Sequence, residues 1–381
     1  MGDTLGRVDP AQALVLYQEG LAIRRKLAAQ EPGNTAFQRD LSVSLERMGD
    51  TLGRVDPAQA LTLYQEGLAI RRKLVAQEPG NKAFQRDLSI SLNKIGDTLG
   101  RSDPAQALAL YQEGLAIRRK LAVQEPGNTA FQSDLSVSLD RIGDTLGRSD
   151  PVQALALYQE GLAIRRKLAA QEPGNIEFQR DLSVSLDRMG DTLGPSDPAQ
   201  ALVLYHEGLA IARKLAAQEP GNIEFQTDLI VSLVRLAFAG ERPEKHYSEA
   251  LAILSDLNAR GLLSADQSTW VPAVTAKLAE FYGSQAYEAL FDKDFTGAEQ
   301  RANAGLGLDA RLDWIKSNLA HALMFQNRIA EADAIYLGLR GTAVQGKPWE
   351  QLIEEDFKAL RDKNIQHPHM AEIEAAFRKR R

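Results

Sequence analysis

The strongest constraint on the fold of this chain is an internal repeat of 47 residues. The string GDTLG occurs five times, beginning at Gly2, Gly49, Gly96, Gly143 and Gly190. One tyrosine and one phenylalanine recur in every copy at the same spacing. A fixed period in this range is typical of an array of stacked supersecondary units, each packed mainly against its neighbours. We therefore expect a repeat protein rather than several unrelated globular domains.

Each repeat is predicted to contain two helices. In the third copy, Asp103 is placed to cap a helix that begins with proline and runs to about Gln124. The Pro-Gly-Asn turn that follows ends this helix and supplies Asn128 as the next N-cap. The preceding helix is expected from about Lys82 to Gly100. No segment alternates apolar and polar residues as a strand does, so the predicted fold is all-α.

The first helix of each pair has an apolar side and a charged side. In the helix expected from about Lys82 to Gly100, the apolar stripe consists of Phe84, Leu88, Leu92, Ile95 and Leu99. Gly96 lies beside this stripe, where close helix contact is expected to exclude large side chains but to tolerate alanine. The charged side carries Lys94 and Asp97, which we expect to neutralise each other as an i,i+3 pair.

This pattern resembles the tetratricopeptide repeat (TPR). The likeness rests on Leu92 and Gly96 in one helix and on Ala107, Tyr111 and Gly114 in the next. The unit is longer than the usual ~34 residues, and the segment QALALYQEGLAIRRKLAAQEPGN is similar to the long-helix repeats of kinesin light chains. The resemblance implies a right-handed α-solenoid of antiparallel helix pairs. It also implies that the first helix of each pair lines a concave groove.

We expect three regions along the chain. Residues 1–240 contain five near-identical 47-residue TPR-like repeats, the first truncated at its N-terminus, and residues 241–347 contain diverged TPR-like repeats. Residues 348–381 are expected to form capping helices, because the ends of a solenoid need a polar outer face. Met1 falls late in a first helix, which suggests a fragment of a longer array or a gene that begins at an internal methionine. The uncapped end is open to self-association.

The sequence contains no recognisable catalytic or metal-binding constellation. It has no cysteine, which excludes disulfides and thiolate zinc sites. Ser42 and Ser44 recur in every copy, as packing residues do and a nucleophile does not. His367 and His369 flank a proline without a further ligand at a recognised spacing. We predict that the chain is not an enzyme and has no cofactor.

The charge pattern gives no general attraction to nucleic acid. The net charge is −6, and acidic residues balance the repeated RRK triplets that begin at Arg24, Arg71, Arg118 and Arg165. The sequence also lacks a signal peptide and an apolar run long enough to cross a bilayer. We therefore expect a protein or peptide partner, no nucleic acid, no membrane partner and a cytoplasmic location.

Two functions fit these features. The first is a protein–protein interaction scaffold that binds a partner peptide or domain in the concave groove. The second is the sensing or regulatory repeat region of a larger bacterial signalling or defence enzyme whose effector domain is absent.

A candidate contact patch lies in the C-terminal half. The positions that carry paired charges in the regular copies become aromatic there, and one helical turn further on lie two more rings. The predicted partner-binding residues are Phe238, Tyr287, Phe291, His321 and Phe325, together with Val234 and Arg235. Aromatic side chains on a groove lining mark a possible binding surface. The alternative is that some of them pack against the long helix near Pro272.

Overall fold

The computed structural model describes residues 10–53, 55–100, 102–147 and 149–379. The chain divides into two compact units, one ending at Leu204 and the other beginning at Tyr205. The boundary falls inside helix α10 (Pro198–Gln218). The fold is that of an all-α solenoid, in which helices that follow one another in the sequence pack together.

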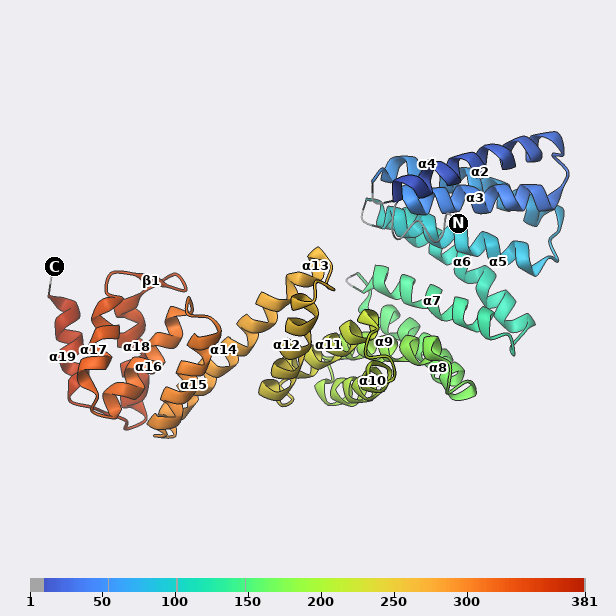
Figure 1. Cartoon of the computed structure of the whole chain (residues 1–381). Coiled ribbons are helices and arrows are strands. Elements are labelled where there is room, and N and C mark those ends of the chain that lie inside the picture. The colour runs from blue at the N-terminus through green and yellow to red at the C-terminus, as the bar shows by residue number, and fades with distance from the viewer. Residues whose placement is uncertain (1–9, 54, 101, 148, 380–381) are drawn as a thin grey trace. The chain divides into compact units, whose positions relative to one another are not determined.

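The first unit is a stack of helix pairs (Figure 1). The first helices of the pairs are α3 (Thr35–Leu52), α5 (Lys82–Leu99), α7 (Thr129–Leu146) and α9 (Ile176–Leu193). The second helices are α2 (Pro10–Gln30), α4 (Pro57–Gln77), α6 (Pro104–Gln124) and α8 (Pro151–Gln171). Each helix from α2 to α8 packs against the next one. The bounds of α5 and α6 confirm the predicted helices to within a residue or so at each end.

Side-chain caps fix where these helices begin. The Asp103 carboxylate accepts a hydrogen bond from the backbone N–H of Gln106 at 2.9 Å, and proline follows it at the first helical position. Asn128 caps α7 in the same way, accepting from the N–H of Phe131 at 3.3 Å. The same two caps recur in the other described repeats, which explains why the helix boundaries could be predicted from the sequence.

In three of the described repeats a tyrosine ring of the second helix packs against a glycine of the first helix, as Tyr64, Tyr111 and Tyr158 do against Gly49, Gly96 and Gly143. A Cβ atom added at Gly96 would come within 2.5 Å of the Tyr111 ring, and one at Gly49 within 2.6 Å of the Tyr64 ring. Real Cβ atoms do not approach other atoms this closely. The expectation that alanine would be tolerated at Gly96 is therefore wrong, because an aromatic ring already fills the space where the methyl group would lie.

The second unit contains shorter and less regular helices. Its elements after α10 are α11 (Ile223–Phe238), α12 (Pro243–Ala259), α13 (Ala265–Ser268), α14 (Trp270–Phe291), α15 (Phe295–Leu308), α16 (Asp313–Phe325), α17 (Ile329–Gly338), β1 (Ala343–Val344), β2 (Lys347–Pro348), α18 (Trp349–Asp362) and α19 (His369–Arg378). The short helix α13 and the β1–β2 hairpin were not predicted. Gln345 and Gly346 both have positive φ, as a two-residue hairpin turn requires.

The largest buried side chains of the second unit lie near its C-terminal end. Trp349, Tyr336 and Phe357 are fully buried. The Trp349 indole N–H donates to the backbone carbonyl of Tyr336 at 2.8 Å, which ties α18 to α17. Within the described part of the chain, no helix combines the length and the apolar character that crossing a bilayer requires.

Candidate partner-binding surface

Rows of ion pairs join equivalent positions of neighbouring repeats in the first unit. Lys94 Nζ lies 2.6 Å from Asp50 Oδ2, and Arg141 Nε lies 2.7 Å from Asp97 Oδ1. Each basic residue thus binds the aspartate of the repeat before its own, and the predicted i,i+3 pairing is wrong for Lys94 and Arg141. Their long side chains reach the neighbouring helix instead of the next turn. We call the side of α3, α5, α7 and α9 that carries these pairs the ladder surface.

Tyrosines hold the aspartates of the ladder surface in place. The hydroxyl of Tyr111 donates to Asp97 at 2.8 Å, and the hydroxyl of Tyr64 donates to Asp50 at 2.7 Å. Burial, followed by this hydrogen bond, raises the pKa of both tyrosines well above its ordinary value. Each of these aspartates therefore accepts one hydrogen bond from a tyrosine of its own repeat and another from the lysine or arginine of the next repeat.

A second row of pairs runs along the same helices. Arg39 Nε lies 2.6 Å from Asp87 Oδ2, and Arg86 Nε lies 2.5 Å from Asp134 Oδ2. The hydrogen bonds to aspartate raise the pKa of both arginines, and burial lowers it only in part. In the next repeat the row changes, because Ser133 occupies the position of Arg39 and Arg86.

A cavity lies on the ladder surface where this row changes. Its volume is about 480 Å³. It is lined by Asp97, Val137, Asp140, Arg141, Asp144, Arg165, Asp181, Val184 and Arg188. Four of these residues are acidic and three are basic. The cavity is therefore polar, with two valines on its walls.

The first arginine is buried in three of the four RRK triplets, at Arg71, Arg118 and Arg165, which the sequence analysis missed, whereas Arg24 is exposed. Arg118 is only 4% exposed. Its Nε donates to Ser89 Oγ at 3.1 Å, and its Nη1 donates to the Asp134 carbonyl at 2.6 Å and to Ser138 Oγ at 3.0 Å. Burial lowers the pKa of Arg118. The repeated serines are thus hydrogen-bond acceptors for an arginine. The serines and the arginine recur with the same 47-residue spacing, and this shared period could have suggested that they interact.

The exposed side chains of the candidate patch lie on α11. Phe238 is 81% exposed. Val234 and Arg235 are partly exposed one turn earlier in the same helix. No ring contact joins Phe238 to another aromatic side chain among the described residues. The structure therefore keeps these three residues together and accessible.

The other residues of the patch form aromatic pairs on the second unit. Tyr287 meets Phe291 edge to face, with ring centroids 5.0 Å apart, and Phe325 stacks on Phe295 at 4.5 Å. These rings are partly buried and pack against the C-terminal core. The alternative stated in the sequence analysis was that some of these rings pack against the long helix near Pro272. They do pack inside the protein, but against the C-terminal core.

His321 is fully buried, so its assignment to an exposed patch is wrong. Its Nδ1 lies 2.7 Å from the Tyr336 hydroxyl, and its Nε2 lies 3.1 Å from Asp356 Oδ2. The Phe357 ring covers it, with centroids 5.3 Å apart. The repeat register placed His321 on a groove lining, but α17 and α18 cover that side of α16. A partner cannot reach this histidine.

The C-terminal histidines make hydrogen bonds with carboxylates and an amide. His369 Nε2 lies 2.6 Å from Asp333 Oδ1, and its Nδ1 lies 2.7 Å from Glu372 Oε2. His367 Nε2 lies 3.2 Å from Asn327 Oδ1. Across the described residues, no three histidine, aspartate or glutamate side chains are arranged to hold a metal ion.

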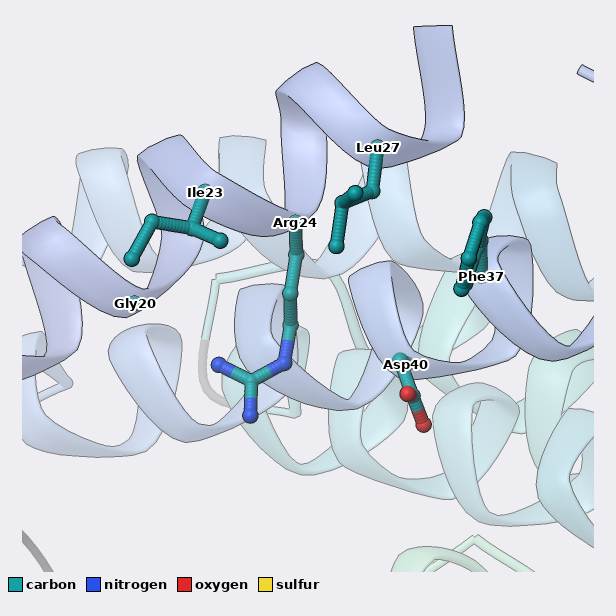
Figure 2. Close-up of a pocket in the computed structure, with 6 residues that line it drawn as sticks. All are labelled: Gly20, Ile23, Arg24, Leu27, Phe37 and Asp40. Atoms are coloured by element: carbon teal, nitrogen blue, oxygen red, sulfur yellow. The ribbon is translucent and has the colours of Figure 1, made fainter. Parts of the chain in front are cut away.

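Another cavity, of about 320 Å³, lies between α2 and α3. Figure 2 shows its lining, with Ile23, Arg24 and Leu27 on α2 and Phe37 and Asp40 on α3. Leu27 is 36% exposed here, whereas the equivalent leucine of α4 is 2% exposed. The exposed side of α2 thus corresponds to a buried side of α4.

Comparison with known proteins gives matches among solved structures alone. No family model matches the sequence, and no curated protein matches it. A TPR protein from Parabacteroides merdae is 14% identical, with a TM-score of 0.37 over 84% of this chain and 95% of that one. Human IFIT1 in a dimer with m7Gppp-AAAA is 12% identical, with a TM-score of 0.33 over 88% of this chain and 78% of that one. A circular tandem repeat protein is 14% identical, with a TM-score of 0.32 over 96% and 89%.

The IFIT1 matches correct one sequence-based expectation. We expected no nucleic-acid partner, from the net charge and from the acidic residues that balance the repeated RRK triplets. Several IFIT1 structures that match this chain are of the protein with capped or triphosphorylated oligonucleotides. The exclusion of nucleic acid from chains of this architecture is therefore wrong. At 12% identity the match assigns no such ligand to this chain.

Proposed function

We propose that this chain, which is a TPR-like repeat protein, is an interaction scaffold that binds a segment of a partner protein. The observation that carries the proposal is the exposure of Phe238. Its side chain is 81% exposed, at a repeat position that the preceding copies fill with aspartate. Covering such a ring is favourable, because burial of apolar surface contributes roughly 25 cal/mol per Å².

The surroundings of Phe238 suit a binding anchor. Val234 and Arg235 lie one turn earlier, so that an aliphatic, a cationic and an aromatic side chain are neighbours on one helix face. Leu233 and Leu236 are fully buried on the other side of α11 and hold the helix in place. Aromatic residues and arginine dominate the binding energy of protein interfaces. A rigid helix presents them with little loss of conformational entropy on binding.

We also propose that the scaffold has no catalytic activity. Many charged residues of the ladder surface are bound to one another in pairs, as Lys94 is to Asp50 and Arg141 is to Asp97. Paired groups of this kind support the stack rather than transfer protons to a substrate. A turnover measured with the purified chain, and abolished by one substitution, would contradict this part of the proposal.

The decisive test is partner capture by a Phe238→Ala variant. Val152 is a matched control, because it is an apolar residue with the same 81% exposure on α8. We expect Phe238→Ala to abolish capture, Val152→Ala to leave it unchanged, and both variants to melt at the temperature of the parent. A photo-crosslinking residue at position 238, but not at position 152, should attach the partner covalently. Equal capture by both variants would overturn the proposal.

A nucleic-acid partner is the competing outcome of the same experiment. The parent and the two variants are therefore also assayed with a capped oligonucleotide. Retention of the oligonucleotide by the parent, lost in Phe238→Ala and kept in Val152→Ala, would replace the protein partner by RNA.

A further inference from the structure

One ion pair of the second row is incomplete, because the position of its arginine is occupied by another residue. We call each position of a row, with its acidic and its basic residue, a rung. Asp87 and Asp134 each bind the guanidinium group of the repeat before, at 2.6 and 2.5 Å. The next aspartate in the row is Asp181, and the residue at the position of the arginine is Ser133. The serine side chain is too short to reach the neighbouring helix. The row therefore continues in its acidic residue but not in its basic one.

The arginines around Asp181 are bound to other carboxylates. The cavity of about 480 Å³ on the ladder surface contains Asp181 and three arginines. These arginines form the pairs Arg141–Asp97, Arg165–Asp140 and Arg188–Asp140. Within the described ranges, no hydrogen bond or ion pair joins the Asp181 side chain to another residue. Burial raises the pKa of Asp181, and the charges of nearby arginines offset this only in part.

We propose that the cavity at Asp181 binds the guanidinium group of an arginine side chain of the partner. This deepens the proposed function, on which it rests, by naming the chemistry of the partner segment. Asp87 and Asp134 provide the precedent, since the same residue type at the same repeat position holds a guanidinium in each case. Val137 and Val184 line the cavity, and the alkyl stem of the incoming arginine would pack on them.

The test uses two dye-labelled peptides with the full chain. One peptide is acetyl-Gly-Gly-Arg-Gly-Gly-amide, and the other has citrulline, which is uncharged and nearly isosteric, in place of arginine. Fluorescence polarisation should detect binding of the arginine peptide and none of the citrulline peptide. Asp181→Asn should weaken binding about tenfold or more. Asp87→Asn is the matched control, because Arg39 already occupies that rung, and it should leave the affinity unchanged.

A second variant does not depend on the stability of Asp181→Asn. Ser133→Arg should complete the row from within the chain, abolish peptide binding and leave the melting temperature unchanged or higher. Equal binding by the parent and Ser133→Arg, equal binding of the citrulline peptide, or no binding of the arginine peptide to the parent would overturn the inference. Loss of partner capture in Phe238→Ala would then still support the scaffold, so that the two proposals fail separately.

Discussion

At the scale of single residues, the glycines Gly49, Gly96 and Gly143 each pack against a tyrosine ring of the following helix. Gly96→Ala places a methyl group 2.5 Å from Tyr111, and we expect it to lower the free energy of unfolding by ~1–3 kcal/mol. Helix propensity alone would predict a gain of up to ~1 kcal/mol. Gly100→Ala in the following turn is the control, because its Cβ would make an ordinary contact at 3.4 Å. Urea denaturation of both variants tests the difference, and equal midpoints would contradict it.

Two adjacent arginines provide a matched pair of a different kind. Arg118→Ala removes the donor of two buried serines, Ser89 and Ser138, and we expect a loss of ~2–4 kcal/mol. Arg119 makes an exposed ion pair with Glu160, so Arg119→Ala should cost no more than ~0.5 kcal/mol. Thermal melting of both variants measures the contrast. A larger effect at Arg119 would show that the buried hydrogen bonds contribute little.

These residues mark the limit of what the sequence could predict. Local chemistry identifies Asp103 and Asn128 as caps, because a cap acts within three residues of the chain. The burial of Arg118 depends on serines from two other helices, and charge alone suggests an exposed side chain. The partner of Lys94 is ambiguous for the same reason, since Asp97 and Asp50 are both within reach of a long side chain. The repeat pattern predicts that His321 is exposed, because it occupies the position of a charged residue in the regular copies. The structure buries it, because α17 and α18 cover that side of α16.

At the scale of elements, His369 joins α19 to α17, and we expect its ionisation to make the stability of the second unit depend on pH. Burial lowers the pKa of His369, but hydrogen bonds to Asp333 and Glu372 outweigh it and raise the pKa above its ordinary value of 6.5. A raised folded-state pKa stabilises the fold fully below about 6.5. That stabilisation is lost as the pH rises through the folded-state value. We expect the melting temperature to fall over this window.

The variant His369→Gln should remove this part of the pH dependence. His367 is the control, because burial lowers its pKa and the linkage then has the opposite sign. Melting is measured from below to above neutral pH for the parent, for His369→Gln and for the control variant His367→Gln. The same slope in the parent and in His369→Gln would show that the contacts with Asp333 and Glu372 do not hold the proton.

At the scale of the whole molecule, the stability of an array is a sum over repeats and their nearest-neighbour contacts. The ion-pair rows contribute to the contacts between repeats, because each pair spans two of them. The pairs are not equivalent. Arg141 binds Asp97 through two hydrogen bonds, of 2.7 and 2.9 Å, and Tyr111 fixes the same aspartate. A network that is held in place in this way loses little entropy when its pairs form.

An exposed row, represented by Arg72 and Glu113 at 2.7 Å, provides the comparison. We expect Arg141→Ala to lower the free energy of unfolding by about 1 kcal/mol and Arg72→Ala by less than ~0.5 kcal/mol. In 1 M salt the Debye length is ~3 Å. The effect of Arg72→Ala should then vanish, whereas that of Arg141→Ala should persist in part, because its side chain is 32% exposed compared with 51% for Arg72. Equal loss of both effects in high salt would mean that the tyrosine-supported rungs are no stronger than ordinary surface ion pairs.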